Sequence, residues 1–439
     1  MDRIEQRIIE AIRAKREELI AFGEETFRSA ETGYEEFNTA RRAADWLRAL
    51  GYTVTEGLAV TGLRAETGRK DGPTLAIIGE LDGILCPTHP QANAATGGFS
   101  HACGHHAQIN AVLGAALAFA DPEIAGLLDG RVVFFLVPAE EYVPIERRVR
   151  LAAEGKVRRC SGKSELICLG AFDDIDLALT THAHMVDSSA DLLLGNNCST
   201  GTFTKRVRIV GRAAHAAAAP YDGINALSAA TLGLSAIGLL REGFREKDCV
   251  RVHTNITHGG DVINVVPADV TVEGMVRAAN LEALEAVSAK FDRAFAGCAD
   301  AIGAKAETET WQGYLPGPFI PASQAQRQAA EAVQAAFGPD FTVEEADPSV
   351  QNYASTDVGD LAQVMPIVNF SHGGVTGSLH SRDFAVTDPD KALVMPAAMM
   401  ALTAWQLLQN GAALARETIA GYHTPFTREE YRKYLEQFR

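Results

Sequence analysis

The sequence lacks the features of several protein classes. Its 439 residues hold 40 Lys+Arg against 56 Asp+Glu, a formal net charge of −16. An acidic chain repels phosphate backbones, and no Lys/Arg-rich helix or arm stands out, so we expect no nucleic-acid partner. No stretch of about 18 apolar residues without charges occurs, and residues 1–27 lack the apolar core of a signal peptide. We therefore expect no membrane partner.

Cysteine pairs and common catalytic motifs are also missing. The seven cysteines form no CxxC pair; they are Cys86, Cys103, Cys160, Cys168, Cys198, Cys249 and Cys298. An odd, scattered set suits a reducing compartment better than a disulfide framework, which predicts a cytoplasmic protein. Neither GxSxG nor GxxxxGK[ST] occurs, which argues against a serine hydrolase and a P-loop enzyme.

The first part of the chain alternates strand and helix patterns. Short continuous apolar runs at 74–79, 131–137 and 176–179 are typical of strands buried in a sheet that is covered on both faces. Between them, apolar residues at helical spacing from Ile109 to Ala120 predict one apolar helix face, which stops at Asp121-Pro122. An amphipathic helix is expected near residues 3–29. This alternation predicts an α/β core.

A different pattern begins near residue 199. The expected elements there are strands at 203–210, 250–256, 269–276 and 305–310 and helices at 223–240 and 280–302. The order βαββαβ is that of a small separate α+β domain. Core-like segments then return, with a buried strand at 366–370 and a closing helix at 389–409. We predict a catalytic domain made of 1–198 and 312–439, interrupted by an inserted domain at 199–311.

Residues that carry chemistry stand at the ends of several predicted strands. They lie in ELD (80–82), SHACGHHAQ (100–108), VPAEE (137–141), THAH (181–184) and GSLH (377–380). The carboxyl ends of strands in open α/β sheets face the crevice that binds ligands, so a single shared site is more plausible than five unrelated groups. Thiolate, imidazole and carboxylate together favour manganese, zinc, cobalt or nickel over magnesium or calcium.

These motifs also carry a resemblance. HACGH, PAEE, GRAAHAAAAP, GGDVINVVPADVTVEGMVR and GSLH, in this order, resemble the metal-dependent amidohydrolases of the M20 peptidase family, in its branch of aminoacylases, carboxypeptidases, indole-acetyl-amino-acid hydrolases and aminobenzoyl-glutamate hydrolases. The resemblance implies a mixed-sheet metallohydrolase core with helices on both faces and an inserted lid or dimerisation domain. It also implies one or two bound divalent ions; the implied ligands are Cys103, His105, Glu141, His182 and His380.

The same resemblance assigns roles to further residues. Glu140 would be the general base, and Asp82 would orient a ligand from behind. In such enzymes the inserted domain forms homodimers or larger homo-oligomers, and a histidine at the place of His215 reaches a substrate oxygen. Asn264 matches a position that helps to hold the substrate, and we add His106 and His184 as candidate substrate contacts. His182 is favoured over His184 as the metal ligand, because it keeps the spacing of the family from the preceding acidic residue.

Two departures from the family pattern stand out. His106 and Gln108 occupy positions where the family usually has Asp and His, so His106 could be an extra ligand, a substrate contact or a hydrogen-bond donor. The interval from Glu141 to His182 is longer than usual and basic over residues 147–163. A solvated helix face explains such a segment by default, and recognition of a substrate carboxylate by some of its arginines is the alternative.

We predict a metal-dependent hydrolase of the amide bond in a small N-acyl or N-aroyl amino acid or a related carboxylate, in which metal-activated water and Glu140 do the chemistry. Two alternatives remain. One is hydrolytic deamination of an activated aromatic amine, as in a nitroanthranilate aminohydrolase similar to this family, which the altered segment around His106 keeps open. The other is a silent protein that binds small molecules without converting them.

Overall fold

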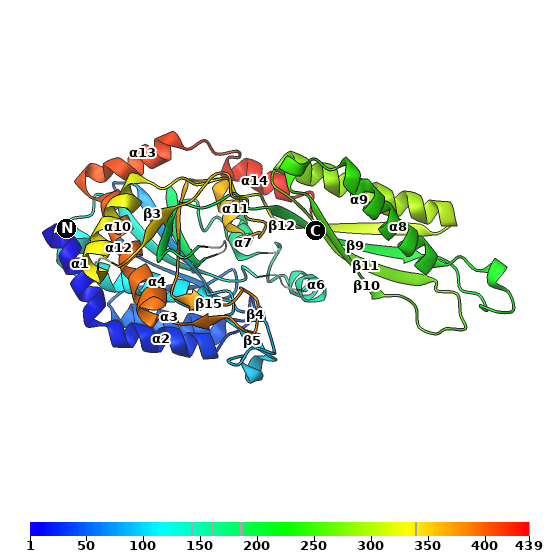
Figure 1. Cartoon of the computed structure of the whole chain (residues 1–439), viewed down its shortest axis with the longest axis horizontal. Helices are drawn as coiled ribbons and strands as arrows, with labels where there is room; N and C mark the ends of the chain where they lie inside the picture. Colours follow the sequence, from blue (N-terminus) through cyan, green and yellow to red (C-terminus); the bar gives the residue numbers. More distant parts are fainter. Residues whose placement is uncertain (142–143, 160, 185–187, 339, 439) are drawn as a thin grey trace. The chain divides into compact units, whose positions relative to one another are not determined.

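The computed structural model describes residues 1–141, 144–159, 161–184, 188–338 and 340–438, so Cys160 lies outside the described residues. The chain forms two compact units, each made of three stretches (Figure 1). Unit 1 comprises Met1–Cys198, Pro318–Asn352 and Asp360–Arg432, and unit 2 comprises Ser199–Gly317, Tyr353–Gly359 and Lys433–Arg439.

Unit 1 is built on a sheet of eight strands in the order β1-β2-β6-β3-β7-β14-β8-β13. In chain order the strands are β1 (Thr55–Leu58), β2 (Gly62–Gly68), β3 (Thr74–Glu80), β6 (Arg131–Val137), β7 (Leu177–Ala183), β8 (Leu192–Leu194), β13 (Val343–Glu345) and β14 (Ile367–His372). Strands β6, β3, β7 and β14 run parallel, whereas β2 and β8 pair antiparallel to β6 and β14. The predicted mixed α/β fold is confirmed, and the four parallel strands are the four apolar runs of the sequence.

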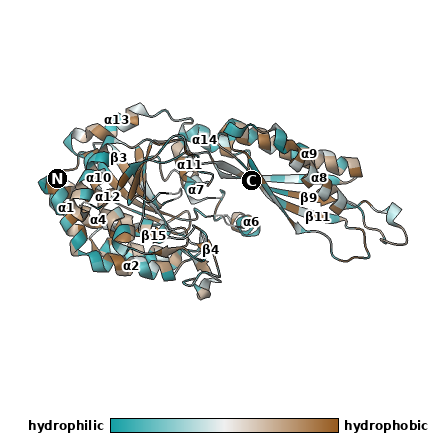
Figure 2. Cartoon of the chain, in the orientation of Figure 1, coloured by the Kyte–Doolittle hydropathy of each residue, from teal (hydrophilic) through white to brown (hydrophobic). Residues whose placement is uncertain are grey.

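Unit 1 also contains helices. They are α1 (Arg3–Ala14), α2 (Arg16–Arg28), α3 (Phe37–Ala49), α4 (His105–Phe119), α5 (Pro122–Gly126), α6 (Ile145–Ala153), α7 (Gly162–Cys168), α10 (Gln324–Phe337), α11 (Val358–Ala362), α12 (Met395–Leu408), α13 (Ala413–Gly421) and α14 (Arg428–Leu435). Of these, α3, α4, α5, α10 and α12 contact strands of the sheet, and α11 and α14 extend into residues of unit 2. The outer helices carry both hydrophilic and hydrophobic residues, while the central strands are hydrophobic (Figure 2). The expected single helix at 3–29 is two helices, which meet at Lys15.

Helix α4 differs from its prediction. The sequence predicts one apolar face, but every residue of the helix except Leu117 is buried. The reason is that α4 packs on β3 and is also covered by α2 and α12. The contact with α12 is close at Gly114, where an added Cβ would lie 2.4 Å from the Cβ of Ala397. A core helix with small residues of this kind needs no polar face.

The closing helix begins with a wide turn over Asp390–Val394 and continues as α12. Pro396 cannot donate a backbone hydrogen bond, and the side chain of Asn110 donates to the carbonyl of Leu393 at 2.7 Å. The stretch Asp390–Leu408 is long and apolar enough to cross a membrane by length and composition, although it includes the charged Asp390 and Lys391. Nearly all of it is buried inside the protein, as in a core helix.

Unit 2 has the predicted element order βαββαβ. Its elements are β9 (Gly201–Val210), α8 (Ala226–Leu240), β10 (Arg251–His258), β11 (Asp269–Ala278), α9 (Leu281–Ile302) and β12 (Lys305–Tyr314). The strands form an antiparallel sheet in the order β10-β11-β9-β12, and α8 and α9 pack together beside it (Figure 1). Val270, Val272 and Val276 alternate along β11 and are buried, which is the two-residue period of a half-covered sheet.

Candidate metal centre

Two parallel strands of unit 1 end where the predicted acidic residues begin. Glu80 ends β3, and Asp82 follows two residues later; Glu140 and Glu141 follow β6. The carboxylate of Asp82 is fully buried and accepts the backbone N–H of Glu140 at 3.1 Å and that of Glu141 at 2.8 Å. One carboxylate therefore fixes the backbone of the two consecutive glutamates.

The turn before Glu140 is strained and is held from both sides. Ala139 has φ +49°, a left-handed conformation that costs an alanine roughly 1 kcal/mol. Its N–H donates to the carboxyl group of Glu36 at 2.8 Å, and its carbonyl accepts the N–H of Gly162 at 3.0 Å. Burial, together with the nearby charge of Asp82, raises the pKa of Glu36 to about 8. These contacts direct Glu140 and Glu141 into the site.

A glycine turn brings the predicted thiol to the same place. Gly104 has φ +89° and precedes α4; a Cβ on it would lie 2.9 Å from the Cβ of Ala183. Because the loop approaches β7 so closely, the Sγ of Cys103 lies 3.5 Å from Nε2 of His182. The same sulfur lies 3.1 Å from Nε2 of His380.

The five predicted ligands come together in overlapping groups. Cys103, His105 and His182 form one group and Cys103, Glu141 and His380 a second; within each, the potential ligand atoms all lie within 4.8 Å of one another. Nε2 of His380 is 3.1 Å from a carboxylate oxygen of Glu141. A third group with the same spacing consists of Glu80, His105 and Glu140.

Burial and neighbouring charges shift the pKa values of several groups in this cluster, and some of its buried atoms have no hydrogen-bond partner in the part of the chain that the structure describes. Burial, with the charge of Glu141, raises the pKa of the Cys103 thiol well above its ordinary value, and burial lowers the pKa of His182 to about 4. Within the described residues, Nε2 of His105, Oε1 of Glu141 and Oε2 of Glu80 are buried without a hydrogen-bond partner. Buried polar atoms of this kind are rare unless something satisfies them, and bound divalent cations are one kind of group that would do so.

His106 and His184, two of the predicted substrate contacts, are each engaged by neighbouring residues. His106 is fully buried and stacks on Phe27 with ring centroids 4.4 Å apart, and burial lowers its pKa to about 3. Both ring nitrogens of His184 are engaged, Nε2 with the carbonyl of Ala190 at 2.7 Å and Nδ1 with the hydroxyl of Ser371 at 3.2 Å. Neither histidine belongs to the three groups of potential ligands.

His215 and Asn264 lie in unit 2, on neighbouring loops. The N–H of Ala216 donates to the backbone carbonyl of Asn264 at 3.0 Å, and His215 pairs with Val265 as an isolated β-bridge. Nδ1 of the exposed His215 ring accepts the N–H groups of Ala217 and Ala218 at 3.2 and 3.1 Å. These backbone donors fix the ring on its loop with Nδ1 as the acceptor.

The structure adds one residue pair that the sequence did not single out. Lys163, in the first turn of α7, is fully buried, and its ammonium donates to Oε1 of Glu80. Burial alone would raise the pKa of Glu80, but the charges of Lys163 and the nearby histidines lower it to about 2. The sequence showed Glu80 at a strand end and Lys163 within the basic segment, without a reason to connect them.

The rest of the basic segment is mixed in character. Lys156 pairs with Glu154 at 2.8 Å on the surface, as expected for a solvated face. Arg147 forms an ion pair with Glu35 and is mostly covered, and Arg148 is buried. The default interpretation therefore fits only part of the segment.

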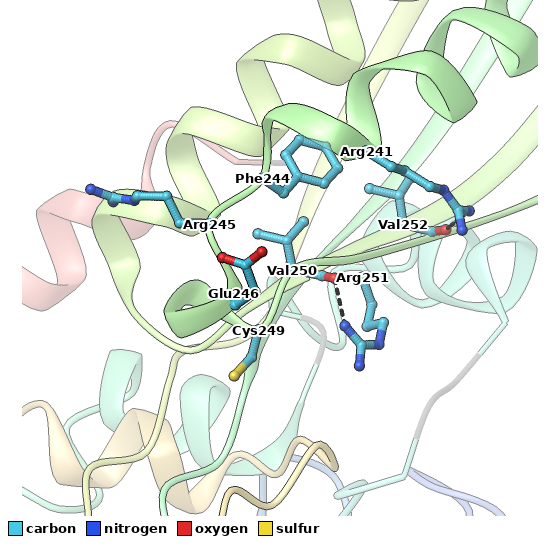
Figure 3. Close-up of a pocket in the computed structure, with 8 residues that line it drawn as sticks. All are labelled: Arg241, Phe244, Arg245, Glu246, Cys249, Val250, Arg251 and Val252. Atoms are coloured by element: carbon cyan, nitrogen blue, oxygen red, sulfur yellow. Dashed lines mark hydrogen bonds between the residues drawn. The ribbon is translucent and has the colours of Figure 1, made fainter.

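A separate hollow lies in unit 2. It measures about 370 Å³ and is lined by Arg241, Phe244, Arg245, Glu246, Cys249, Val250, Arg251 and Val252 (Figure 3). Arg241 and Arg251 donate to the backbone carbonyls of Val252 and Val250, at 3.2 and 2.9 Å, and Arg245 points away from them. The arginines do not converge on one point, so this hollow lacks the geometry of an anion site.

Comparison with known proteins identifies the inserted region. Residues 199–297 match the peptidase dimerisation domain of the M20 family. The chain is 31 % identical over 286 residues to a p-aminobenzoyl-glutamate hydrolase polypeptide from Escherichia coli, which is 63 % of this chain and 54 % of that protein. The chain thus spans about half the length of that relative. N-acetylcysteine deacetylase from Bacillus subtilis is 28 % identical over 330 residues, 71 % of this chain and 81 % of that protein.

A solved structure shares the fold. A dinuclear metal-binding peptidase of the M20 family from Bacillus subtilis superposes with a TM-score of 0.63 at 21 % identity, covering 89 % of this chain and 98 % of that one. The sequence matches confirm the predicted relationship to the M20 family, and the solved structure confirms the fold.

Proposed function

This chain contains the dimerisation domain of the M20 peptidase family and is related to amidohydrolases of that family, and on that premise we propose that it hydrolyses the amide bond of a small N-acyl or N-aroyl amino acid. One observation carries the proposal: Asp82 fixes two consecutive glutamates that face different parts of one donor cluster. Glu141 lies 3.1 Å from Nε2 of His380, and Glu140 lies 3.8 Å from Nε2 of His105. Such a pair separates the task of binding an ion from the task of moving a proton.

We assign the ion to Cys103, His105, Glu141, His182 and His380. A divalent transition ion, one or two of manganese, zinc, cobalt or nickel, matches this mixture of sulfur, nitrogen and oxygen donors. Bound there, it supplies Lewis-acid polarisation and lowers the pKa of a nearby water.

The residues of the chain perform the proton transfers. Glu140 takes a proton from the attacking water as the water oxygen bonds to the amide carbon. The carbon–nitrogen bond then breaks, and Glu140 passes the proton to the leaving nitrogen, which gives a free amine and a carboxylic acid. Asp82 keeps Glu140 in place through the backbone N–H that it accepts. His215 donates to the developing oxyanion, and Asn264, His106 and His184 serve as substrate contacts.

The assembly follows from the same premise. We assign 1–198 and 312–439 to a catalytic domain and 199–311 to a lid and dimerisation domain, through which the chain forms a homodimer or a larger homo-oligomer. Relatives named for N-acyl and aminobenzoyl amino acids support a substrate that carries a carboxylate. The six described cysteines are free thiols, which supports a reducing, cytoplasmic location.

The proposal is tested with the purified protein loaded with manganese, cobalt or zinc. A pooled panel of N-acyl amino acids, p-aminobenzoyl-glutamate, dipeptides and substituted anthranilates is offered, and products are identified by mass spectrometry. We expect a free amino acid together with its acid partner. Ammonia with a hydroxylated ring would replace the proposal by aromatic deamination, and tight binding without any product would indicate a silent binding protein.

Two variants test whether Glu140 moves the proton and Glu141 binds the ion. Glu140→Gln should lower turnover by about 10²- to 10⁴-fold and leave the metal content unchanged, whereas Glu141→Gln should lose metal. Glu154→Gln, on the surface beside Lys156, is the matched control. Full activity in Glu140→Gln would rule out this mechanism.

A further inference from the structure

Lys163 is a lysine inside the protein. Its exposed fraction is 0 %, and the carboxylate of Glu80, with which it pairs, is 2 % exposed. A buried charge is stable only when it is paired and hydrogen-bonded. The backbone fixes Lys163 in place as well, because the preceding Gly162 donates to the carbonyl of Ala139 at 3.0 Å and has no room for a Cβ, which would lie 1.7 Å from the carbonyl oxygen of Pro138. Helix α7 is thus docked directly on the turn that leads to Glu140.

Lys163 occupies only one oxygen of Glu80. The other oxygen, Oε2, lies 3.2 Å from Nε2 of His105, yet the two atoms make no hydrogen bond, and neither has another partner among the described residues. Nδ1 of His105 lies 2.8 Å from the backbone carbonyl of Asp82. Because a carbonyl can only accept, Nδ1 donates in this contact, and Nε2 is the ring nitrogen that faces Glu80. Nε2 is therefore the atom of His105 that could bind an ion together with Oε2 of Glu80.

A metal ion placed beside Nε2 of His105 would have three potential ligand atoms within reach, which all lie within 4.8 Å of one another. Oε2 of Glu140 lies 3.8 Å from the same nitrogen, so three potential donors surround one point. We infer that Glu80 is a further ligand of the metal centre and that Lys163 is the positioning residue that holds it. This inference rests on the proposed function in so far as that function requires a divalent ion.

The role of Lys163 follows from charge and geometry. The centre gathers the carboxylates of Glu80, Glu140 and Glu141 beside the Cys103 thiol, and Lys163 is the counter-charge nearest to Glu80. By engaging Oε1, the ammonium leaves Glu80 a single oxygen for an ion, so the carboxylate binds through one atom. Residues that hold ligands in this way commonly change metal affinity by about 10- to 100-fold when they are removed.

The test uses cobalt(II) as the probe in the full-length protein, because its visible absorption reports the ligands directly, without any turnover. Glu80→Gln should weaken cobalt binding by about 10- to 100-fold and change the spectrum. Lys163→Met should also change the spectrum, because Glu80 is then released. When Glu80 is already replaced by glutamine, Lys163→Met should cause no further change in the cobalt spectrum, because Lys163 acts on the metal only by holding Glu80.

The controls separate positioning from a structural ion pair. Thermal melts of the metal-free variants measure stability, and the double variant Glu80→Gln/Lys163→Met removes both charges, so it folds even if Lys163→Met alone does not. Cobalt affinity and spectrum like those of the unaltered protein in Glu80→Gln would overturn the ligand assignment. An unaltered spectrum in folded Lys163→Met would overturn the positioning role. If the unaltered protein binds cobalt but cleaves no amide, the proposed function fails while this result stands by itself.

Discussion

Asp82 accepts the backbone N–H of Glu141 at 2.8 Å with one oxygen of a carboxylate that is fully buried. Its other oxygen accepts the neighbouring N–H of Glu140 at 3.1 Å. Asp82 therefore holds both glutamates by their backbone N–H groups. A carboxylate is suited to this, because both of its oxygens only accept hydrogen bonds.

The variant Asp82→Asn tests this arrangement. An asparagine offers one acceptor oxygen and an NH₂ group, which would face a backbone donor. We expect metal affinity to fall by about 10- to 100-fold and turnover to fall with it. Cobalt titration and initial rates measure the two effects, with the exposed Asp71→Asn as control. Wild-type affinity and rate in Asp82→Asn would contradict the assignment.

The two histidines of THAH should differ in their effect on the metal. His182→Ala removes a nitrogen that lies 3.5 Å from the sulfur of Cys103, so the metal content after dialysis should fall by about tenfold or more. His184→Ala should leave the metal content unchanged, because both ring nitrogens of His184 already have partners. Elemental analysis of the dialysed variants checks this. An equal loss in both would show that His184 also reaches the ion.

The glycine turn before α4 can be tested against a matched glycine. Gly104→Ala adds a Cβ 2.9 Å from that of Ala183, at φ +89°, and should lower both stability and metal content. Gly155→Ala, at φ +68°, imposes similar backbone strain with nothing within 4 Å of the new atom. We expect Gly155→Ala to cost about 1 kcal/mol in urea unfolding and Gly104→Ala clearly more. Equal losses would mean that the close approach to β7 does not matter.

Glu36 should make the metal-free protein sensitive to pH. Its pKa is about 8 in the folded protein, because of burial and Asp82, and about 4.3 in the unfolded chain. Between these values only the folded state keeps the proton, so stability is highest at the acidic end and falls as pH rises, by on the order of 5 kcal/mol over the whole range.

The variant Glu36→Gln should flatten this dependence. Its amide can still accept the N–H of Ala139 and face the hydroxyl of Thr61, which now bond to the carboxyl group. Urea unfolding between pH 5 and 9 compares it with the exposed Glu10→Gln. A wild-type curve that is already flat, or a variant with the same slope, would contradict this account.

Much of the fold of unit 1 could be predicted because each of its buried strands can be recognised from a short local stretch of sequence. Strands buried on both faces appear as unbroken apolar runs, and β3 and β6 are each a single run of this kind. The acidic and histidine residues stand directly after such runs, which is why the sequence could indicate a shared edge of the sheet. Glu141 lies at that edge because it follows β6, whereas Cys103 and His380 reach the site from the loops before α4 and after β15 (Val375–Thr376), and the roles of all three as ligands stay predictions.

Other features depend on partners far along the chain. Helix α4 is buried all round because α12, nearly three hundred residues later, covers it, and no local period reports this. Lys163 and Glu80 are 83 residues apart, and a lysine inside a basic segment gives no sign that it folds inward. The short stretches that unit 2 takes from later in the chain were likewise missed.

Unit 2 draws on three stretches of chain, and this affects how it can be produced alone. A fragment limited to 199–297 would lack β12, which pairs with β9 along its length. It would also lose Ser355, whose hydroxyl accepts from Arg277 at 2.7 Å, and Phe438, whose ring centroid lies 4.8 Å from that of Phe203. Any recombinant version of the unit therefore has to join 199–317 to the loop at 353–359 and to the segment from 433 onward, through engineered linkers.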